Sequence, residues 1–350
     1  MDESSSAHSK IVVVVLNWNN WEDTILSAES VLRSDYPNFQ LVIVDNDSTD
    51  GSPKRVKEWA EGKLKATVDP DDTLNYLYDP PVEKPVPYAE YDRGGAENSE
   101  ADMPEAPLVL IQTGENLGYA GGNNVAIKFV QRRESDSYIL ILNNDAAVTP
   151  GFLASAMDLL AGGEGAGLSV LGFVAHWYHE PERVATAYMR EEFTKGPMFV
   201  TEPPKGGGRL KRGVMVYGGA MLITPESPVK LLPEEYFMYC EDMDYCKQVF
   251  AKGGEIAAQL DNPVYERGGS SIGSNSPAQI YYTRRNKLAF SKRHYSKLEY
   301  TLILARMAYS TVAGCARSIL RGDREMVKAH LLAYLHHLQG KMGRTWMPGR

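Results

Sequence analysis

The sequence predicts an α/β protein with a mostly parallel central sheet flanked by helices and a helical extension at the C-terminal end. The first observation is a set of short apolar, β-branched runs such as 11–16 and 40–44, typical of strands buried on both faces of a parallel sheet. The second is that helical patterns separate the runs, as at 21–34. The third is that polar residues follow the runs. Strands joined by right-handed crossover helices explain all three observations.

The expected elements can be given in chain order. Strands are predicted at 11–16, 40–44, 108–111, 138–142, 168–173, 214–223 and 264–265, and helices at 21–34, 53–64, 123–133, 241–252, 277–294 and 296–339. Residues 180–212 are expected to be irregular and partly antiparallel, and 205–212 to form a loop. Residues 1–290 are predicted to form the main domain, and 291–350 a basic helical extension.

The segment 69–106 differs from its surroundings in composition. It carries 11 acidic residues, two basic residues and six prolines, with few apolar residues apart from tyrosines. Such a composition buries too little apolar surface to favour a packed structure, so an exposed, poorly ordered, flexible insertion is predicted. A lid or a partner-binding loop is the alternative.

Composition limits the compartment. The 350 residues are 43% hydrophobic and 23% charged, which is ordinary for a globular protein. Three cysteines are too few for a disulfide framework and indicate a reducing compartment. The polar N-terminus lacks the pattern of a signal peptide, and no run of ~18 uncharged apolar residues predicts a membrane-spanning helix. A cytoplasmic location is therefore expected.

The net charge of −8 is distributed unevenly. Residues 284–350 contain 14 Lys and Arg against three acids, a net +11, which leaves −19 on residues 1–283. This asymmetry predicts an anionic partner for the C-terminal helices, such as lipid phosphate at a membrane surface. Nucleic acid is disfavoured because no aromatic and basic stacking pattern is present. Internal packing or a homodimer is the alternative explanation for the apolar stripe of these helices.

Polar residues end three predicted strands, at Asn17, Asp45 and Asn143–Asp145. Ligands of open α/β sheets bind at the carboxyl ends of the strands, so these side chains are candidates for a binding site, although turns also favour Asp and Asn. Asn143 and Asp145 could both direct an oxygen towards one cation. Mg²⁺ and Mn²⁺ prefer oxygen ligands and need few from the protein when phosphates supply the rest.

A second acidic cluster comprises Glu241, Asp242 and Asp244, with aromatic residues around it. A carboxyl group in an apolar wall can have a raised pKa that suits a general base. Helix capping is the simpler alternative, although it needs only one acid. The glycine-rich segment 114–124 matches neither the dinucleotide fingerprint nor the P-loop, so its glycines are interpreted as allowing a tight turn or close approach to a ligand.

These motifs together resemble inverting family 2 glycosyltransferases of the GT-A fold, and particularly their rhamnosyltransferase-like branch. The matching segments, in order, are V-V-L-N-W-N at 14–19, V-D-N-D-S-T-D-G-S at 44–52, N-L-G-Y-A-G-G-N-N at 116–124, L-N-N-D at 142–145, G-G-A at 218–220, Y-C-E-D-M-D at 239–244 and Y-Y-T-R-R-N at 281–286. The resemblance covers roughly residues 10–290, and the ordered succession makes it specific.

The resemblance implies a role for individual residues. Asp242 would be the catalytic base, with Glu241 beside it, and Asp145 would bind a divalent cation, Mg²⁺ or Mn²⁺. Asn143 stands where many members have aspartate. The nucleotide and donor sugar would be bound by Asn17, Asp45, Asp47, Asn116, Gly118, Asn124, Asn143, Asn144, Gly218, Gly219, Arg267 and Arg285.

One segment departs from the family pattern. Members often carry a histidine before the glycine-serine turn, whereas this chain reads V-Y-E-R-G-G-S-S, with Glu266 at that position and Arg267 next to it. Glu266 would replace the histidine as a metal ligand. Alternatively, Arg267 stabilises phosphate, or the metal dependence of the site is altered.

The expected function is the transfer of a sugar from a dTDP- or UDP-sugar to a hydroxyl of a glycan or lipid-linked acceptor, with inversion, by metal-assisted single displacement. The setting would be cell-envelope polysaccharide biosynthesis, in the cytoplasm or peripherally on the inner face of the membrane. A non-catalytic sugar-binding protein of the same fold is the alternative. A nucleotidyltransferase is disfavoured because N-W-N-N-W after the first strand lacks glycine and basic residues. A processive synthase is disfavoured because transmembrane helices and Q-x-x-R-W are missing from the sequence.

Overall fold

The computed structural model describes residues 9–69, 71–98, 101–192, 196–202, 208–268 and 276–348. The strands are β1 (Ile11–Asn17), β2 (Phe39–Asp45), β3 (Tyr88–Asp92), β4 (Leu108–Gln112), β5 (Tyr138–Asn143), β6 (Ala146–Ala147), β7 (Leu168–Trp177), β8 (Glu180–Thr186), β9 (Tyr188–Glu192), β10 (Gly196–Val200), β11 (Leu210–Arg212), β12 (Ala220–Ile223) and β13 (Glu255–Glu266). The α-helices are α1 (Trp21–Leu32), α2 (Ser52–Ala60), α3 (Arg93–Asn98), α4 (Gly118–Arg133), α5 (Phe152–Ala161), α6 (Glu241–Ala251), α7 (Pro277–His294), α8 (Lys297–Leu320) and α9 (Arg324–Leu338).

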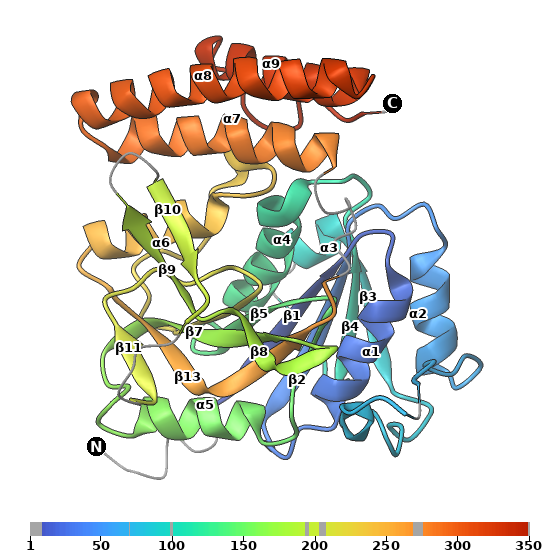
Figure 1. Ribbon diagram of the computed structural model, residues 1–350. Helices are drawn as coiled ribbons and strands as arrows, with labels where there is room; N and C mark the ends of the chain where they lie inside the picture. The colour runs from blue at the N-terminus through green and yellow to red at the C-terminus, as the bar shows by residue number, and fades with distance from the viewer. Residues whose placement is uncertain are drawn as a thin grey trace.

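A large mixed sheet forms the centre of the molecule, with the order β11-β13-β7-β12-β5-β1-β2-β4-β3 (Figure 1). The pairs of β1 with β2 and β5, of β4 with β2 and β3, and of β13 with β7 are parallel. Strand β12 is antiparallel to both of its neighbours, β5 and β7. The predicted mostly parallel sheet flanked by helices is confirmed.

Helices cover both faces of the sheet, because the strands are apolar on both sides. Val13 and Val15 of β1 pack in the core beneath α1, α2 and α5. Val12 and Val14 point the other way, into the core beneath α3, α4 and α6. The continuous β-branched run at 11–15 is therefore explained by alternate residues that fill two different cores.

The register of the parallel strands places their polar ends side by side. Asn17 pairs with Asp45 across β1 and β2, and Leu16 pairs with Asn143 across β1 and β5. The carboxyl ends of three central strands therefore form one edge, as the sequence predicts. Each of these strands ends within one residue of the position expected for it.

The segment 69–106, predicted as an exposed, poorly ordered insertion, contains a strand and a short helix, although many of its described residues are exposed. Strand β3 pairs in parallel with β4 at the edge of the sheet, and α3 follows directly. Leu77 is fully buried in a small core that includes Leu26 and Tyr178, and Ala96 of α3 is buried in the core beneath that helix's neighbour α4. A few isolated apolar residues pack this acidic segment against the domain. Because they are spaced irregularly, the sequence shows no helical or strand periodicity there. Residues 70, 99 and 100 lie outside the described part.

Three further elements differ from the prediction. The single helix expected at 296–339 is divided into α8 and α9 by Gly322, which has φ +70°, and Asp323 caps the second helix. The strand expected at 214–223 is limited to β12, so Gly218 and Gly219 precede it. The short strand at 264–265 is the end of the longer β13. Of the loop expected at 205–212, residues 210–212 form β11, and 205–207 lie outside the described residues.

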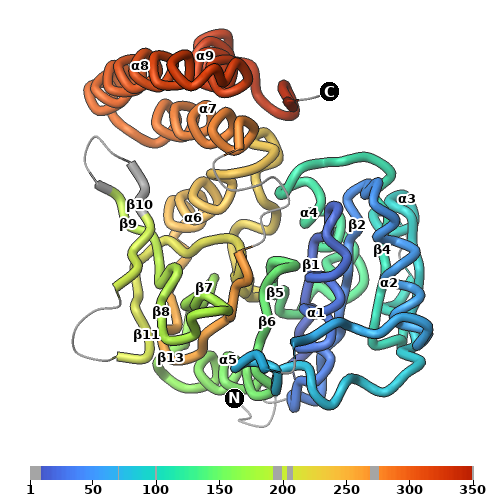
Figure 2. The backbone as a smooth tube through the Cα atoms, turned by 45° about the vertical axis from the view of Figure 1, so that its right-hand side comes forward, coloured from blue at the N-terminus to red at the C-terminus, as the bar shows by residue number. Residues whose placement is uncertain are grey.

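Helices α7, α8 and α9 form a separate layer on the side of α6 (Figures 1 and 2). Helix α7 lies nearest to the rest of the protein, and α8 and α9 lie outermost (Figures 1 and 2). Asn286 of α7 connects the layer to the loop before α6, because its side-chain amide donates to the carbonyl oxygens of Tyr236, Met238 and Tyr239 at 2.7–2.9 Å. Within the described residues, no helix is long and apolar enough to cross a membrane.

Candidate functional site

A cavity of about 320 Å³ lies at the carboxyl ends of β1 and β5, between the N-termini of α4 and α6. Many of its lining residues are those that the sequence predicted: Asn116, Gly118, Asn143, Asn144, Asp145, Gly218, Gly219, Glu241 and Asp242. The sequence did not single out the other lining residues as site residues: Leu16, Trp18, Asn46, Tyr119, Phe199, Tyr217, Met238 and Tyr239. The structure therefore brings the two predicted acidic clusters to one cavity.

The first acidic cluster follows β5. The backbone amide of Asn143 donates a hydrogen bond to the carbonyl oxygen of Gly219 at 2.8 Å. This bond holds the turn against the segment before β12. The backbone carbonyl of Asp145 accepts a hydrogen bond from the Arg267 amide at 2.9 Å, and Ala146 pairs with Glu266. The end of β13 therefore lies beside the turn, and Glu266 joins Asp145 although they are far apart in the sequence.

Glu266 has the environment of a carboxyl group held close to another carboxylate. Burial raises its pKa, and the negative charge of Asp145 raises it further, to about 7. The Tyr217 hydroxyl and the Asn143 side-chain amide donate to its Oε1, the latter at 3.4 Å, and partly oppose this rise. A cation between the two carboxylates would relieve their repulsion.

The second acidic cluster begins α6. Tyr239 and Cys240 both have positive φ, 66° and 74°, and this sharp turn directs the first residues of the helix towards the cavity. The Asp242 carboxylate accepts hydrogen bonds from the backbone amides of Gly218 at 3.0 Å and of Met243 at 2.8 Å. Burial raises the pKa of Asp242, and these amides oppose the rise. Its other lone pairs are available on the cavity side.

Glu241 is more deeply buried, with 6% of its surface exposed. Burial raises its pKa well above the ordinary value, and the charge of Asp242 adds to the effect. Among the described residues, its Oε2 atom has no hydrogen-bond partner. A buried carboxyl oxygen without a partner is costly unless the group is protonated or a ligand contacts it. Glu241 is thus a second titratable group on the α6 side of the cavity.

Tyr119 connects the two clusters and is the main residue that the sequence did not reveal. Its hydroxyl lies 3.1 Å from Asn143 Oδ1 and 2.9 Å from the carbonyl oxygen of Gly218. Both partner oxygens accept hydrogen bonds from the hydroxyl. Its single proton is therefore shared between the two oxygens or alternates between them. In the sequence, Tyr119 appears only as one residue of a glycine-rich segment, with no pattern that distinguishes its side chain.

The charges of four acidic residues affect the pKa of Tyr119. Burial raises this pKa well above the ordinary value, and Glu241, Asp242, Glu266 and Asp145 all raise it further through their negative charges. The tyrosine therefore stays protonated and donates hydrogen bonds near neutral pH. It occupies the middle of an acidic site to which β5, α6 and β13 all contribute.

Gly118 allows this arrangement at the start of α4. It has φ +76°, and a Cβ atom at this position would lie 2.1 Å from the carbonyl oxygen of Phe237. The same carbonyl accepts a hydrogen bond from the Tyr119 amide at 2.6 Å. A side chain at Gly118 would therefore separate α4 from the loop that precedes α6. Gly118 therefore permits the close approach of two segments of this chain, and its approach to a ligand stays a prediction.

The predicted nucleotide residues at the ends of β1 and β2 lie in a second, smaller pocket. Asn17 donates to Asp45 Oδ1 at 2.8 Å, and the Ser48 amide donates to Asp45 Oδ2 at 3.0 Å. Asn17 and Asp45 line this pocket with residues of β4, whereas Asp47 is exposed and lines neither pocket. Asn46, which the sequence did not single out, lines the main cavity and donates to the Gly118 carbonyl oxygen at 3.1 Å.

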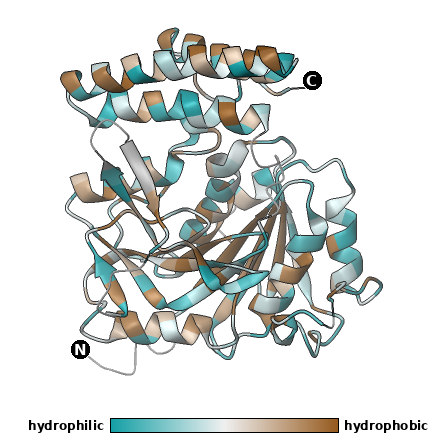
Figure 3. Ribbon diagram, viewed as in Figure 1, coloured by the Kyte–Doolittle hydropathy of each residue, from teal (hydrophilic) through white to brown (hydrophobic). Residues whose placement is uncertain are grey.

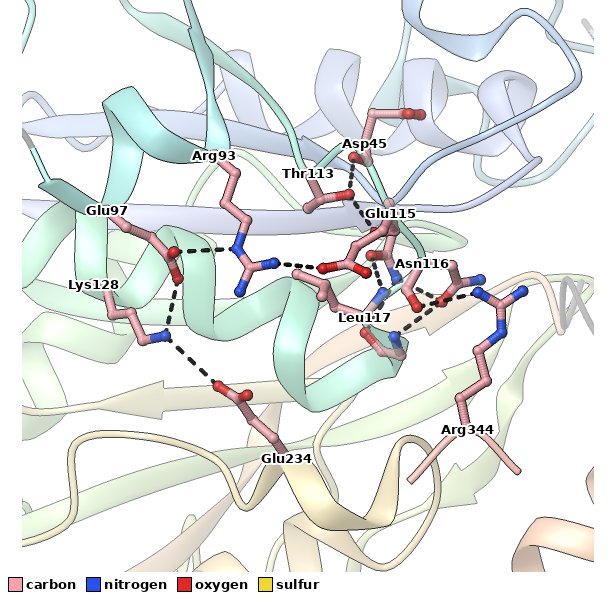
Figure 4. A network of polar contacts seen from close by, with 12 residues as sticks. Asp45, Arg93, Glu97, Thr113, Glu115, Asn116, Leu117, Lys128, Glu234 and Arg344 are labelled. Carbon is pink, nitrogen blue, oxygen red and sulfur yellow. Dashed lines mark hydrogen bonds and ion pairs between the residues drawn. The ribbon is translucent and has the colours of Figure 1, made fainter. Parts of the chain in front are cut away.

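The turn at 113–117 is supported from three directions (Figure 4). The Thr113 hydroxyl donates to the Asp45 carbonyl at 3.0 Å. Arg93 of α3 forms an ion pair with Glu115 at 2.7 Å. Arg344, beyond α9, lies 3.5 Å from the Asn116 carbonyl oxygen. The acidic segment 69–106 and the C-terminal segment therefore both contact the turn that lines the cavity.

Asn124 and Arg285, predicted to bind the donor, are not among the residues that line the main cavity. The Asn124 side chain donates to the Leu232 carbonyl and accepts from its amide, both at 2.9 Å, and so holds the loop before α6. Arg285 is fully buried and donates to the carbonyl oxygens of Tyr236 and Gly343. The motif resemblance located both residues in the chain, but packing directs their side chains to structural contacts.

Arg267 also lies outside the lining of the main cavity. Its guanidinium carbon is 4.1 Å from the centroid of the Tyr178 ring, in a cation–π contact. Its side chain borders another pocket with Asp69, Asp71 and Asp72. Only its backbone amide contacts the acidic turn, through Asp145.

The residues present fit a hard divalent cation that is bound together with a ligand. Among the residues that the structure describes, no group of three or more His, Cys, Asp or Glu side chains could hold a metal ion. Asp145 and Glu266 provide two carboxylates, and Asn143 provides a neutral amide. Two or three protein oxygens suffice for Mg²⁺ or Mn²⁺ when a diphosphate supplies other ligands.

Comparison with solved structures identifies the fold. The mannosyltransferase PcManGT from Pyrobaculum calidifontis, in complex with GDP-Man and Mn²⁺, superposes with a TM-score of 0.52 at 15% identity, covering 95% of this chain and 88% of that chain. The chain has the GT-A fold of glycosyltransferases. Residues 12–72, which contain β1, α1, β2 and α2, match the family described as Glycosyl transferase family 2.

Two proteins are similar to this chain in sequence. The low-salt glycan biosynthesis hexosyltransferase Agl10 of Haloferax volcanii is 21% identical over 258 residues, which cover 67% of this chain and 76% of that protein. An uncharacterized protein of Mycobacterium tuberculosis is 35% identical over 75 residues, which cover 20% of this chain and 28% of that protein.

Proposed function

We propose that this protein is an inverting glycosyltransferase that transfers a sugar from a nucleoside diphosphate donor to a hydroxyl group. The observation that carries the proposal is that Asp145, Glu241 and Asp242 line one cavity of a GT-A fold, with Glu266 close enough to Asp145 for the charge of Asp145 to raise its pKa. Two of them lie beside the strand ends where a donor would bind, and two begin α6 on the opposite side. Glycosyl transfer needs these two functions in one cavity: a site for the diphosphate and a base for the acceptor.

The donor would lie along the carboxyl ends of the central strands. Asn17 and Asp45 would contact the base, and the turn at 116–118 would line the sugar and diphosphate path. Asp145 and Glu266 would hold Mg²⁺ or Mn²⁺, which supplies neutralisation of the diphosphate charge when bound. The complex of the structurally similar mannosyltransferase with GDP-Man and Mn²⁺ supports this placement.

The acceptor would bind beside α6, where Asp242 is the proposed general base. Its raised pKa favours proton transfer from a hydroxyl more than an ordinary aspartate pKa would. Asp242 takes the proton as the acceptor oxygen attacks the anomeric carbon from the face opposite the diphosphate. One bond forms as the other breaks, the nucleoside diphosphate departs, and the anomeric configuration inverts. The Gly218 amide orients the base by binding Oδ2.

The donor sugar is best sought among hexoses and deoxyhexoses. The resemblance to the rhamnosyltransferase-like branch favours dTDP-rhamnose, and the named relatives favour GDP-mannose and other hexose donors. A glycan or lipid-linked hydroxyl in cell-envelope synthesis would be the acceptor. A sugar-binding protein without catalysis is the second candidate, because Glu266 departs from the family pattern.

The test is a screen of dTDP-, UDP- and GDP-sugars with and without Mg²⁺ or Mn²⁺, by release of the nucleoside diphosphate and by thermal shift. We expect one donor to raise the melting temperature only with the cation, because a ligand that binds the native state stabilises it. Asp145→Asn and Glu266→Gln should remove that dependence, and Asp136→Asn, an exposed carboxylate outside the cavity, should retain it. Donor binding without turnover would favour the non-catalytic protein, and no metal-dependent shift would contradict the metal site.

A further inference from the structure

The outer surface of α8 and α9 is unusually apolar. Of the eleven large hydrophobic residues that are exposed in the described part of the chain, nine lie in these two helices. Tyr309 and Val312 are 77% and 70% exposed, and Leu320 is 87% exposed. Figure 3 shows apolar residues along both helices, and Figures 1 and 2 show that nothing in the described structure covers them. We refer to the exposed residues of α8 and α9 as the outer face.

The apolar residues of α8 form a continuous stripe. Leu298, Leu302, Tyr309, Val312 and Ile319 are separated by four, seven, three and seven positions, so they share one side of the helix. The opposite side, with Ile303 and Thr311, is buried. An exposed helix side is normally polar, and a contiguous exposed apolar patch usually marks an interaction surface.

Most of the exposed charges around the stripe are positive, although Asp323 is exposed in the turn and Glu325 pairs with Lys328 at 2.7 Å. Arg306, Arg317, Arg321, Arg324 and Lys328 are all exposed on the same two helices or on the turn between them. They belong to the segment 284–350, which carries a net +11 on a chain whose total is −8. A second copy of the chain would bring two such segments together and repel, whereas an anionic lipid surface would attract the charges and accept the apolar stripe.

We propose that the outer face of α8 and α9 docks on an anionic lipid surface, with the apolar side chains inserted among the headgroups and the basic residues against lipid phosphates. Residues of this kind arranged in this way are typical of helices that lie in the plane of a membrane interface. The helices rest on the surface and do not span it, in agreement with their hydropathy.

The layer that carries the outer face is also connected to the cavity. Helix α7 lies beneath α8 and α9, and Asn286 holds the carbonyl oxygens of Met238 and Tyr239, both of which line the cavity beside Asp242. Docking would therefore hold the acceptor side of the cavity at a fixed position relative to the lipid. On the basis of the proposed function, the acceptor hydroxyl would belong to a lipid-borne glycan.

The experiment is flotation of the full-length protein with vesicles, without any donor. We expect binding to vesicles of equal parts phosphatidylcholine and phosphatidylglycerol, little binding to phosphatidylcholine alone, and a decrease with added salt. The triple variant Arg306→Gln, Arg317→Gln, Arg321→Gln should bind about 100-fold more weakly, since each basic residue contributes about 1 kcal/mol near such a surface. Val312→Ser with Ile319→Ser should also weaken binding, and Tyr76→Ser, an exposed aromatic elsewhere, should not.

Several outcomes would overturn the proposal. One is equal or no binding to both vesicle types by a wild type of normal melting temperature. Another is a dimer in sedimentation that Val312→Ser with Ile319→Ser dissociates, because a second copy would then cover the face. These substitutions are all exposed, so unchanged circular dichroism and melting should establish that the variants fold. Donor hydrolysis without vesicles tests the proposed function separately: vesicle binding without turnover would retain the docking surface and contradict the enzyme.

Discussion

Asp242 and Asp244 lie two residues apart in the first turn of α6, but their environments are opposite. Asp242 lines the cavity and accepts only backbone amides, and burial raises its pKa. Asp244 is fully buried and faces α7, where Arg293 and His294 contact its carboxylate, the latter at 2.9 Å. Two residues correspond to about 200° of rotation around a helix, so the two side chains point in nearly opposite directions.

The comparison shows that burial alone does not identify a catalytic acid. Burial would raise the pKa of Asp244 too, but hydrogen bonds from His294, Tyr236 and Gln248 and the charge of Arg293 lower it to about 2. Asp242 has no charged partner of this kind among the described residues, so its pKa stays raised. A carboxyl group with a raised pKa in a cavity is suited to proton transfer, and one that is paired with cations is suited to holding helices together.

The strongest test of this distinction is Asp242→Asn. The side chain keeps its shape and one acceptor oxygen but cannot take a proton. We expect kcat for sugar transfer to fall by about 10²- to 10⁴-fold, the usual contribution of a general base, with little change in the melting temperature. Transfer assays and thermal melts measure the two effects. Similar turnover in Asp242→Asn and in the exposed control Asp136→Asn would assign the base to another residue, such as Glu241.

Asp244→Asn should have the opposite effect: it should lower the stability of the fold and leave kcat for sugar transfer nearly unchanged. Because the folded pKa of Asp244 lies below the ordinary 3.8, the carboxylate stabilises the fold above pH 3.8 and loses this effect as the pH falls towards about 2. We expect the variant to be less stable by about 2 kcal/mol at neutral pH. Urea unfolding across pH would measure this.

The difference between Asp244→Asn and the wild type should shrink as the pH falls from 3.8 to about 2. Donor binding at neutral pH, below the melting temperature, should be retained. A constant difference across that range would mean that the ion pairs of Asp244 do not set its pKa, and the contrast with Asp242 would then be lost.

Tyr119→Phe tests the contact between the two acidic clusters and should have the smallest effect. It removes one hydroxyl that lies between Asn143 and Gly218. We expect kcat/KM to fall by about 10-fold, because a hydrogen bond contributes about 0.5–1.5 kcal/mol. Steady-state kinetics would measure this, with Tyr309→Phe on the outer face of α8 as the matched control. If both variants were equally active, Tyr119 would not position the turn that holds Asn143.

The sequence predicted the central strands of the sheet because a buried strand is recognised from the few consecutive residues that form it. The β-branched runs at 11–15 and 41–44 pack on both faces, and no other element suits such runs. It missed β3 and α3 because the segment 69–106 is acidic and proline-rich, and its few buried apolar residues, such as Leu77 and Ala96, are spaced irregularly. It predicted one helix at 296–339 because the apolar pattern continues past Gly322, where the positive φ ends α8.

For the site, the sequence identified which residue types lie at strand and helix ends, and ordered motifs indicated their chemistry. Asp145, Glu241 and Asp242 do line one cavity. Tertiary structure alone decided direction and distance: Asn124 and Arg285 turn away to hold loops, and the Tyr119 hydroxyl turns towards Asn143 and Gly218. The reason is physical. Residue type and spacing determine local conformation, but the approach of β13 to β5 and of α6 to α4 arises from packing between segments that are distant in the sequence.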